Sequence, residues 1–479
     1  MSDKPSQPRG QRPTPLTNLV LVQLGVFVVF SSWAFGGQAP WARHIIAWWG
    51  SVGIVLFCLA VRHHRPAGGR LHPALHLLWP LWLYDVLVIV SCFNPSFRKA
   101  MVAGEASLML ITPRPWLPSA ALPHLAAQEL WQFNGLVLSS FNLLLVVSRR
   151  RQLRTLLLVL AGNAVLLAIF GTFQKLAHST GLWFGRVPSP NLRFFSTFIY
   201  YNHWAAFTLL NTTACLALLF YHYKRARGRD IWHSPVLLGL IATLLLALTI
   251  PVSASRSGTL LAALLLGGAL AHLLYRVVRR RRAQQVSSVA PVTVIILAVT
   301  LALAATGYLA RRSIAERVAQ TSQQFSESTD HGFVAGRLTL YRDTWHMAAA
   351  KPWFGWGLES YARVFRIYNT QRAVETWVWI PFYAEAHNDW LQSLAETGFV
   401  GTTLLALLLG LPLGTVRWGR AASVVPRYLL AGCVLILLYA WLEFPFANPA
   451  VMLTFATFFY TAVRYAQLDN AAASSSSDG

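Results

Sequence analysis

Long apolar runs alternate with short polar segments along most of the chain. A bilayer core about 30 Å thick is crossed by a helix of roughly 20 residues, and about twelve runs approach this length. Their expected bounds are residues 16–35, 44–61, 76–93, 131–147, 155–177, 204–222, 235–252, 257–275, 289–309, 395–416, 428–445 and 449–466. The pattern predicts an all-α, polytopic membrane protein with about twelve transmembrane helices.

The polar segments on the two sides of the predicted membrane differ in charge and length. Alternate segments are rich in arginine, as at residues 149–151 and 279–282. Because cytoplasmic loops retain positive charge, both termini are expected in the cytoplasm, with the spans in the inner membrane. The other segments are longer, and the longest is expected to be a helical periplasmic loop between spans 9 and 10.

Five parts are expected along the chain. Residues 1–15 form a cytoplasmic N-terminal tail, and 16–309 carry spans 1–9. Residues 310–388 form a periplasmic loop domain, and 389–466 carry spans 10–12. Residues 467–479 end in the polar sequence AAASSSSDG, which predicts a disordered cytoplasmic tail.

The composition indicates that the folded chain is surrounded by membrane lipid, and it argues against nucleic acid binding and cofactor-dependent chemistry. Hydrophobic residues make up 55% of the chain and charged residues 12%, which is too little polar surface for a soluble globule. The formal charge is +23, but the basic residues are scattered as short runs, so no nucleic acid partner is expected. No Walker motif, GxGxxG fingerprint or D-x-D motif is present, so we expect no cofactor and no metal.

Arg256 is the first candidate for chemistry. It lies in the sequence SASRSG, at the expected outer end of the eighth span. A guanidinium is always charged and its planar fork of donors suits phosphate, so Arg256 is a candidate anchor for a lipid-linked phosphate. The alternative is that its side chain snorkels to lipid headgroups.

The long periplasmic loop contributes a second group of candidates. The sequence AGRLTLYRDTWHMAAA predicts a helix from about residue 335 to 350, with Arg337 and Tyr341 on one face. Arg342 lies about 100° further round. These residues form one wall of a pocket if that face is buried, and a solvated amphipathic helix is the alternative.

His387 lies where the chain re-enters the membrane, with Glu385 and Asp389 on either side. Histidine has an ordinary pKa of about 6.5 and accepts a proton near neutral pH, and a neighbouring carboxylate can fix its tautomer. We therefore predict that His387 is a catalytic base, against the alternative of a structural histidine.

The sequence NLRFFSTFIYYNHWAAF places Arg193 and Asn202 at the outer end of the sixth span, where both are candidate pocket residues. Asp85 and Lys175 are ionisable groups near lipid, which makes them functional candidates by default. For these two residues we favour a role as one half of an interhelical pair.

Four segments resemble the O-antigen ligase and polymerase superfamily of integral membrane enzymes, which includes the Wzy-type polymerases. In order, they are WLPSAALPH, FSTFIYYNHWAAF, SASRSG and GR…KPWFGWGLESY…AHNDWLQSLAETG. The resemblance implies a metal-independent transfer of a glycan from an undecaprenyl diphosphate donor to an acceptor hydroxyl, at the periplasmic face of a bacterial inner membrane. It also implies that Arg256 and Arg337 bind the diphosphate and that His387 activates the acceptor. Arg342 and Arg193 are weaker additions.

The chain departs from the family pattern in one block. Before the sixth span the family often has asparagine, a basic residue, asparagine and histidine, whereas residues 200–203 read YYNH. The basic residue is absent, and Arg193 or Arg186 is the candidate substitute.

The expected partners are a lipid-linked glycan donor, membrane lipid and an acceptor that is another glycan, lipid A core or protein. One alternative function is transport of a small solute such as inorganic carbon, and another is a non-catalytic role in envelope assembly. Transporters carry ionisable residues near the bilayer midplane. Here only Asp85 lies well inside a span, which favours the enzyme.

Overall fold

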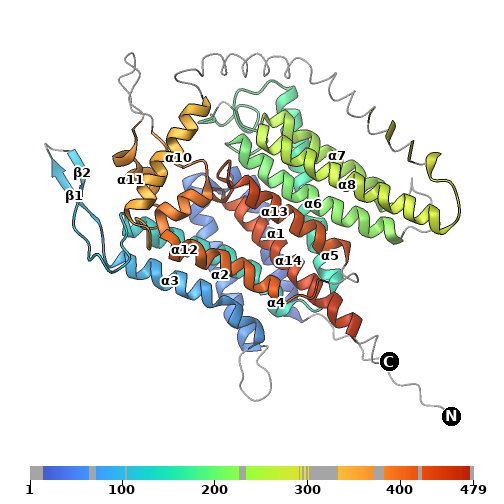
Figure 1. Ribbon diagram of the computed structural model, residues 1–479, viewed down its shortest axis with the longest axis horizontal. Coiled ribbons are helices and arrows are strands. Elements are labelled where there is room, and N and C mark those ends of the chain that lie inside the picture. The colour runs from blue at the N-terminus through green and yellow to red at the C-terminus, as the bar shows by residue number, and fades with distance from the viewer. Residues whose placement is uncertain are drawn as a thin grey trace, which may run out of the picture.

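The computed structural model describes residues 14–63, 72–102, 105–191, 193–225, 234–290, 333–370, 382–418 and 423–474, with 292–293, 296–297 and 300. Long helices run side by side through the molecule, and a smaller helical part covers one end (Figure 1). The helices are α1 (Pro15–Trp33), η1 (Phe35–Gly37), α2 (Pro40–His63), η2 (Pro73–Leu78), α3 (Trp79–Cys92), α4 (Pro123–Val146), α5 (Arg150–Leu176), α6 (Tyr201–Arg225), α7 (Pro235–Ser253), α8 (Arg256–Ala283), α10 (Phe333–Ala350), α11 (Tyr361–Tyr368), α12 (Asp389–Gly414), α13 (Val424–Tyr439), η4 (Pro445–Ala447) and α14 (Pro449–Ser474).

The helical, membrane-spanning character that the apolar runs predict is confirmed. Eight helical segments of the described chain are long and apolar enough to cross a membrane. They are Pro15–Trp33, Pro40–His63, Pro73–Cys92, Arg150–Leu176, Tyr201–Arg225, Pro235–Ser253, Arg256–Ala283 and Asp389–Gly414. Helices α4, α13 and α14 lie at three further expected positions, whereas the expected ninth span, 289–309, falls mostly outside the described residues.

The core of the bundle is formed by helices that are buried on nearly every side. In α6, 89% of the most apolar stretch of 18 residues is buried. Helix α14 is buried along most of its length. Close helix contacts depend on small residues: a Cβ added at Gly50 of α2 would lie 2.8 Å from the Cα atom of Gly135 in α4. Small residues let transmembrane backbones approach in this way.

A β-hairpin interrupts the all-helical pattern between α3 and α4. Strands β1 (Phe97–Val102) and β2 (Glu105–Leu110) pair antiparallel, with Phe97 opposite Leu110. The segment that follows the hairpin is held by Asn94. Its side-chain amide nitrogen donates to the carbonyl oxygens of Arg114 and Pro118, each at 3.1 Å. The hairpin was not expected, because its sequence is short and lacks a regular alternation of apolar and polar residues.

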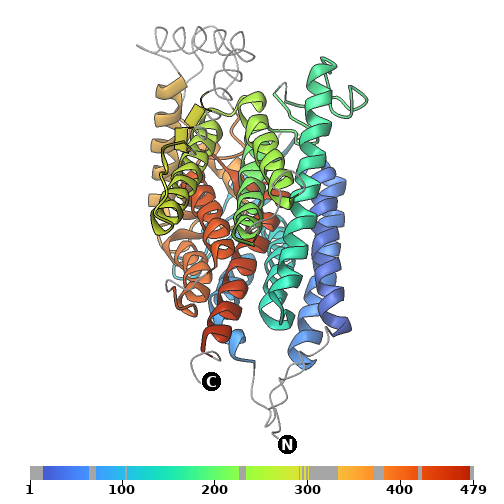
Figure 2. The same cartoon turned by 90° about the vertical axis from the view of Figure 1, so that its right-hand side faces the viewer.

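Helices α10 and α11 form the described part of the long loop, and they pack against the start of α12. Their shared core includes Met347, Trp356 and Phe365. Helix α10 covers the predicted helix at residues 335–350. In Figure 2 these helices lie at the end of the molecule opposite the C-terminal end of α14.

Two glycines join this loop domain to α12 through backbone contacts. Gly355 and Gly398 both have positive φ angles, 66° and 64°. A Cβ at Gly355 would lie 2.3 Å from the carbonyl carbon of Glu396, and one at Gly398 would lie 2.4 Å from that of Trp353. Only glycine fits these positions without strain, so the two residues fix the loop domain against the start of α12.

Helix α13 ends at Tyr439, earlier than the expected end of its span at residue 445. Residues 440–448 leave the helix and contain the short helix η4, and α14 then begins at Pro449. The sequence 441–446, WLEFPF, is apolar enough to extend a span by composition, but Pro445 cannot continue a regular helix. Glu443 consequently lies in a turn and not inside a transmembrane helix.

Candidate functional site

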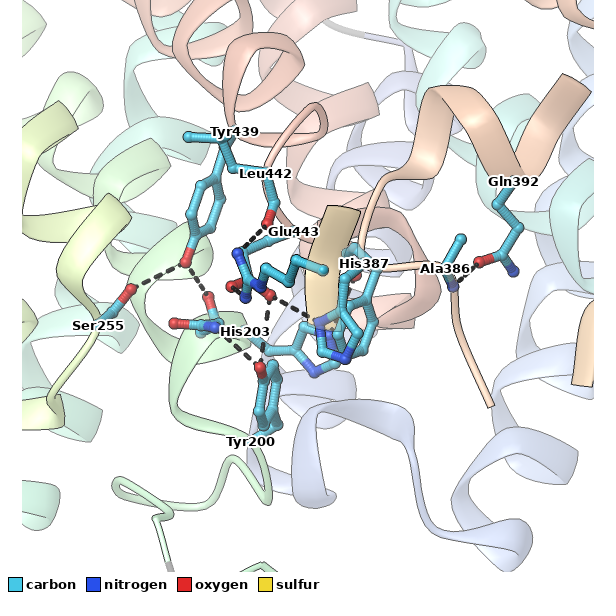
Figure 3. A network of polar contacts seen from close by, with 12 residues as sticks. Tyr200, His203, Ser255, Ala386, His387, Gln392, Tyr439, Leu442 and Glu443 are labelled. Atoms are coloured by element: carbon cyan, nitrogen blue, oxygen red, sulfur yellow. Dashed lines mark hydrogen bonds and ion pairs between the residues drawn. The ribbon is translucent and has the colours of Figure 1, made fainter. Parts of the chain in front are cut away.

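A buried carboxylate, that of Glu443, joins an arginine to a histidine at the end of the bundle that carries α10. Oε1 of Glu443 accepts a hydrogen bond from Nη2 of Arg337 at 2.6 Å. Its Oε2 lies 3.3 Å from Nδ1 of His387 (Figure 3). The Glu443 side chain is 4% exposed, compared with 26% for Arg337 and 27% for His387. The carboxylate is therefore enclosed, while its two partners remain accessible from outside.

The three side chains come from three separate segments. Arg337 lies on α10, His387 in the loop before α12, and Glu443 in the turn after α13. Arg337 is held a second time, because its Nη1 donates to the carbonyl oxygen of Leu442 at 3.1 Å. Packing of the loop domain against α12 thus brings together groups that are far apart in the sequence.

The backbone of His387 is fixed on both sides. Its φ angle is 52°, in a region that non-glycine residues seldom occupy. The hydroxyl of Tyr341 donates to its carbonyl oxygen at 2.9 Å. On one side the N–H of Ala386 donates to Oε1 of Gln392 at 2.9 Å, and on the other Asn388 caps α12 by accepting from the N–H of Leu391. Strained backbone of this kind persists only where the surroundings enforce it, and it is frequent at functional sites.

Charge in the site is arranged to keep Glu443 ionised. Burial by itself raises the pKa of this carboxyl, but the hydrogen bond to His387 and the positive charge of Arg337 outweigh burial and hold the pKa below its usual value. A carboxylate that accepts from Nδ1–H of a histidine leaves Nε2 of the ring as the basic nitrogen. The pair can thus accept a proton from a substrate.

Aromatic rings cover one side of this group. The ring of Phe444 meets the His387 ring edge-on at 4.7 Å and stacks on Tyr200 at 5.1 Å. His203 donates through Nε2 to the carbonyl oxygen of Phe444, with the two atoms 3.1 Å apart. These rings exclude water from the enclosed side of the carboxylate, which strengthens its interactions with charged partners.

Asn202, a predicted pocket residue, is connected to the site through a second layer. Its side-chain amide donates to the Tyr200 hydroxyl at 2.9 Å, and that hydroxyl lies 3.4 Å from Oε2 of Glu443. Asn202 is only 3% exposed. It is therefore placed to support the site and not to line its open side.

Arg256 lies at the same end of the bundle, as the first residue of α8. The preceding Ser255 caps this helix, and its hydroxyl is 2.9 Å from that of Tyr439. The Tyr439 hydroxyl in turn donates to the carbonyl oxygen of Asn202 at 3.4 Å. Ser255 thus connects the start of α8 to the network, while the Arg256 side chain is exposed.

The remaining predicted residues occupy different positions. Tyr341 positions His387, as described above. Arg342 is exposed on α10, and its neighbour Asp343 is turned inward to accept from the hydroxyl of Thr370 at 2.9 Å. Arg193 is also exposed, with its backbone carbonyl accepting from the N–H of Tyr201. No described contact joins Arg342 or Arg193 to Glu443.

Glu443 is the residue that sequence reasoning missed. The carboxylates next to His387 in sequence have other partners: Glu385 accepts from Gln392 at 2.7 Å, and Asp389 from the N–H of Phe446 at 3.0 Å. The available signal was the isolated acid in WLEFPF, because an ionisable group among lipid-facing residues is a functional candidate.

Asp85 and Lys175 have ordinary structural partners. The Asp85 carboxylate on α3 accepts from the side-chain amide of Asn134 on α4 at 2.8 Å, which confirms the expected interhelical pair. The ammonium group of Lys175 lies 5.0 Å from the ring centre of Phe194.

A cavity of about 260 Å³ lies on the other side of the His387 loop. Its lining includes five carboxyl side chains, those of Glu129, Glu359, Glu385, Asp389 and Glu396. Burial raises the pKa of Glu385 to about 7. Within the described ranges, no three His, Cys, Asp or Glu side chains are grouped so that they could hold a metal ion.

Comparison with known families agrees with this arrangement. The family model described as O-antigen ligase matches residues 241–406, a segment that contains Arg256, Arg337 and His387 but not Glu443. No curated protein matches the chain. The match supports glycan transfer of the general O-antigen ligase or polymerase type. Together with the candidate membrane spans, the match supports a bacterial membrane protein that contains an O-antigen ligase domain within residues 241–406.

Proposed function

We propose that the protein transfers a glycan from an undecaprenyl diphosphate donor to an acceptor hydroxyl at the periplasmic face of the inner membrane. The observation that carries the proposal is the bridge through Glu443, whose two carboxylate oxygens contact Arg337 and His387. A phosphate-binding group and a base are thereby held beside one another, and both are accessible from outside.

On the donor side, Arg337 and Arg256 bind the diphosphate. When the bond between the sugar and the diphosphate breaks, its electron pair stays with the diphosphate, so negative charge grows on this leaving group. Fixed guanidinium groups stabilise that charge without reorganising, which is the largest source of catalysis at many sites of this kind. The Glu443 side chain is 4% exposed and paired with Arg337, so it does not contact the donor itself.

On the acceptor side, His387 is the base. Its Nδ1–H donates to Glu443, and Nε2 takes the proton of the acceptor hydroxyl as the new bond to the sugar forms. The imidazolium that results is stabilised by the same carboxylate, as in catalytic triads. The activated bond arrives with the donor, so no nucleotide is consumed.

The distribution of basic residues supports a periplasmic location. The ends of α6 and α8 that carry Arg225 and Arg276 are opposite to the ends that carry Asn202 and Arg256. Because basic ends stay in the cytoplasm, His387 and Arg337 face the periplasm in this orientation.

Replacing His387 with alanine in the native host tests the proposal. We expect loss of the surface glycan with accumulation of its lipid-linked precursor, while the variant inserts normally into the membrane. His346→Ala is the matched control, because His346 is exposed on α10 and has no proposed role. Unchanged surface glycan in His387→Ala would rule out the proposed enzymatic function. Solute transport or a non-catalytic role in envelope assembly would then be the remaining explanations.

The accumulated precursor also distinguishes the two reactions of the family. If the acceptor is another glycan chain, the precursor stops at a single repeat unit. If the acceptor is lipid A core or protein, complete polymer accumulates on the lipid carrier. The length of the lipid-linked glycan in His387→Ala therefore identifies the acceptor class.

A further inference from the structure

A large basic cavity lies at the end of the bundle opposite to His387. Its volume is about 1840 Å³, larger than the 300 to 1,000 Å³, roughly, of most small-molecule pockets. Ten arginine and lysine side chains are among its described lining residues: Arg149, Arg150, Arg151, Arg154, Lys224, Arg225, Arg276, Arg279, Arg280 and Arg427. Asp469 is the one carboxylate in the same lining.

These charges converge from separate helices. They come from the start of α5, the ends of α6 and α8, and the turn of α13 that contains Arg427. Orientation of a membrane protein requires only that basic residues lie in cytoplasmic loops. It does not require that they meet around one cavity, where like charges repel one another and destabilise the fold. The convergence thus needs a second explanation.

Aromatic groups hold two of the basic side chains in place. Nη1 of Arg154 donates to the Tyr465 hydroxyl at 3.0 Å, and its guanidinium lies 4.4 Å from the ring centre of Tyr221. Arg225 donates to the hydroxyl of Tyr221. The walls of the cavity are therefore ordered before any ligand binds, which reduces the entropy cost of binding.

The carboxylate available to the cavity is already engaged. Asp469 pairs with Arg150 at 2.6 Å and accepts from the N–H of Ser423 at 3.1 Å. Nη1 of Arg276 is a buried donor that has no hydrogen-bond partner among the described residues. A buried donor of a charged group is costly to leave unpaired, so the cavity suits an anion that the described residues do not supply.

We propose that this cavity binds a phosphate-containing group that carries at least two negative charges in total. A multiply charged phospholipid headgroup, such as one with two phosphodiesters, and a soluble diphosphate share this chemistry. Basic pockets between transmembrane helices on the cytoplasmic side are typical binding sites for multiply charged headgroups. The site is separate from the glycan-transfer site, and its existence does not depend on that function.

Purified full-length protein in detergent can be tested with two anions, cardiolipin and inorganic pyrophosphate, with zwitterionic phosphatidylcholine, of zero net charge, as the comparison. Binding is measured as a concentration-dependent rise in melting temperature and by native mass spectrometry. We expect binding of cardiolipin, pyrophosphate or both, weakened by added salt, and no effect of phosphatidylcholine. Cardiolipin alone identifies a lipid site, and pyrophosphate alone identifies a soluble ligand. Binding of neither anion overturns the proposal.

The sequence offers a matched pair of double variants. Arg276→Gln with Arg280→Gln removes two charges that line the cavity, and Arg281→Gln with Arg282→Gln removes two from the same basic run outside the lining. One basic residue near an anionic headgroup contributes about fivefold in affinity, so the first variant should bind about 25-fold more weakly and the second almost normally. Equal losses in the two variants would mean unspecific attraction and contradict a built site. Arg154→Gln provides a milder third variant if the first proves unstable.

Discussion

Replacing Glu443 with glutamine tests the bridge at the centre of the proposed site. The substitution keeps the size of the side chain but removes the charge that Arg337 and His387 share. Removing one partner of a buried ion pair costs about 3 to 5 kcal/mol. Arg337 is 26% exposed and can regain water, so we expect a loss of about 2 to 3 kcal/mol in unfolding free energy, at the low end of that range or below it.

The effect of Glu443→Gln on transfer should exceed its effect on stability. Replacing the carboxylate behind a catalytic histidine by its amide lowers turnover by about 10⁴ in the serine protease triad. The distance between His387 and Glu443 is 3.3 Å, at the long end for a hydrogen bond. We therefore expect a smaller loss, about 10² to 10³ in rate, measured as glycan transferred in membranes supplied with lipid-linked donor.

Glu385→Gln is the matched control, because Glu385 is nearer to His387 in sequence but contacts Gln392. It should retain most of the transfer activity. Glu443→Asp keeps the charge and should recover part of the rate. Full activity in Glu443→Gln together with a large loss in Glu385→Gln would refute the assignment of Glu443.

Three further predictions follow from the same structure. Arg337→Lys keeps the charge but not the planar fork, and should reduce transfer at saturating donor by at least about tenfold with normal membrane insertion; wild-type transfer would exclude Arg337 from diphosphate binding. Gly398→Ala should cost more than about 2 kcal/mol in unfolding free energy, because the added Cβ would lie 2.4 Å from a backbone atom. Gly410→Ala is the control and should not lower the melting temperature, since a Cβ there would meet nothing within 4 Å. Equal melting temperatures of the two variants would contradict the close contact at Gly398. The pKa of Glu385 is raised from 4.5 to about 7. The neutral carboxyl therefore contributes stability that is fully present below about pH 4.5 and is lost as pH rises through 7. Over this pH window the melting temperature should fall less in Glu385→Gln than in the native protein, and an identical dependence of melting temperature on pH would refute the shift.

The sequence was sufficient for the helices because the length of an apolar run is set by the bilayer. The positions of α1 to α8 and α12 to α14 follow from that constraint alone. The helix at residues 335–350 followed from its periodicity. The structure brings Arg337, Tyr341 and His387 close together, as the sequence led us to expect. Their roles in phosphate binding and proton transfer remain predictions.

The sequence was not sufficient for contacts between distant segments. Glu443 lies 106 residues from Arg337 and 56 from His387, and its position depends on where α13 ends. Composition places Glu443 inside the span, whereas Pro445 and the packing of the loop domain place it in a turn. Gly355 packs against the backbone of Glu396, and Gly398 against that of Trp353. These contacts join segments that are distant in the sequence, so no local pattern predicts them.

The most direct test of the central claim is a structure of the protein with a non-hydrolysable undecaprenyl diphosphate glycan bound. If the proposed site is correct, the diphosphate will lie within hydrogen-bonding distance of the Arg337 guanidinium, with the first sugar beside the His387 ring. A diphosphate bound elsewhere, with Arg337 and His387 both remote from the sugar, would contradict the proposed site.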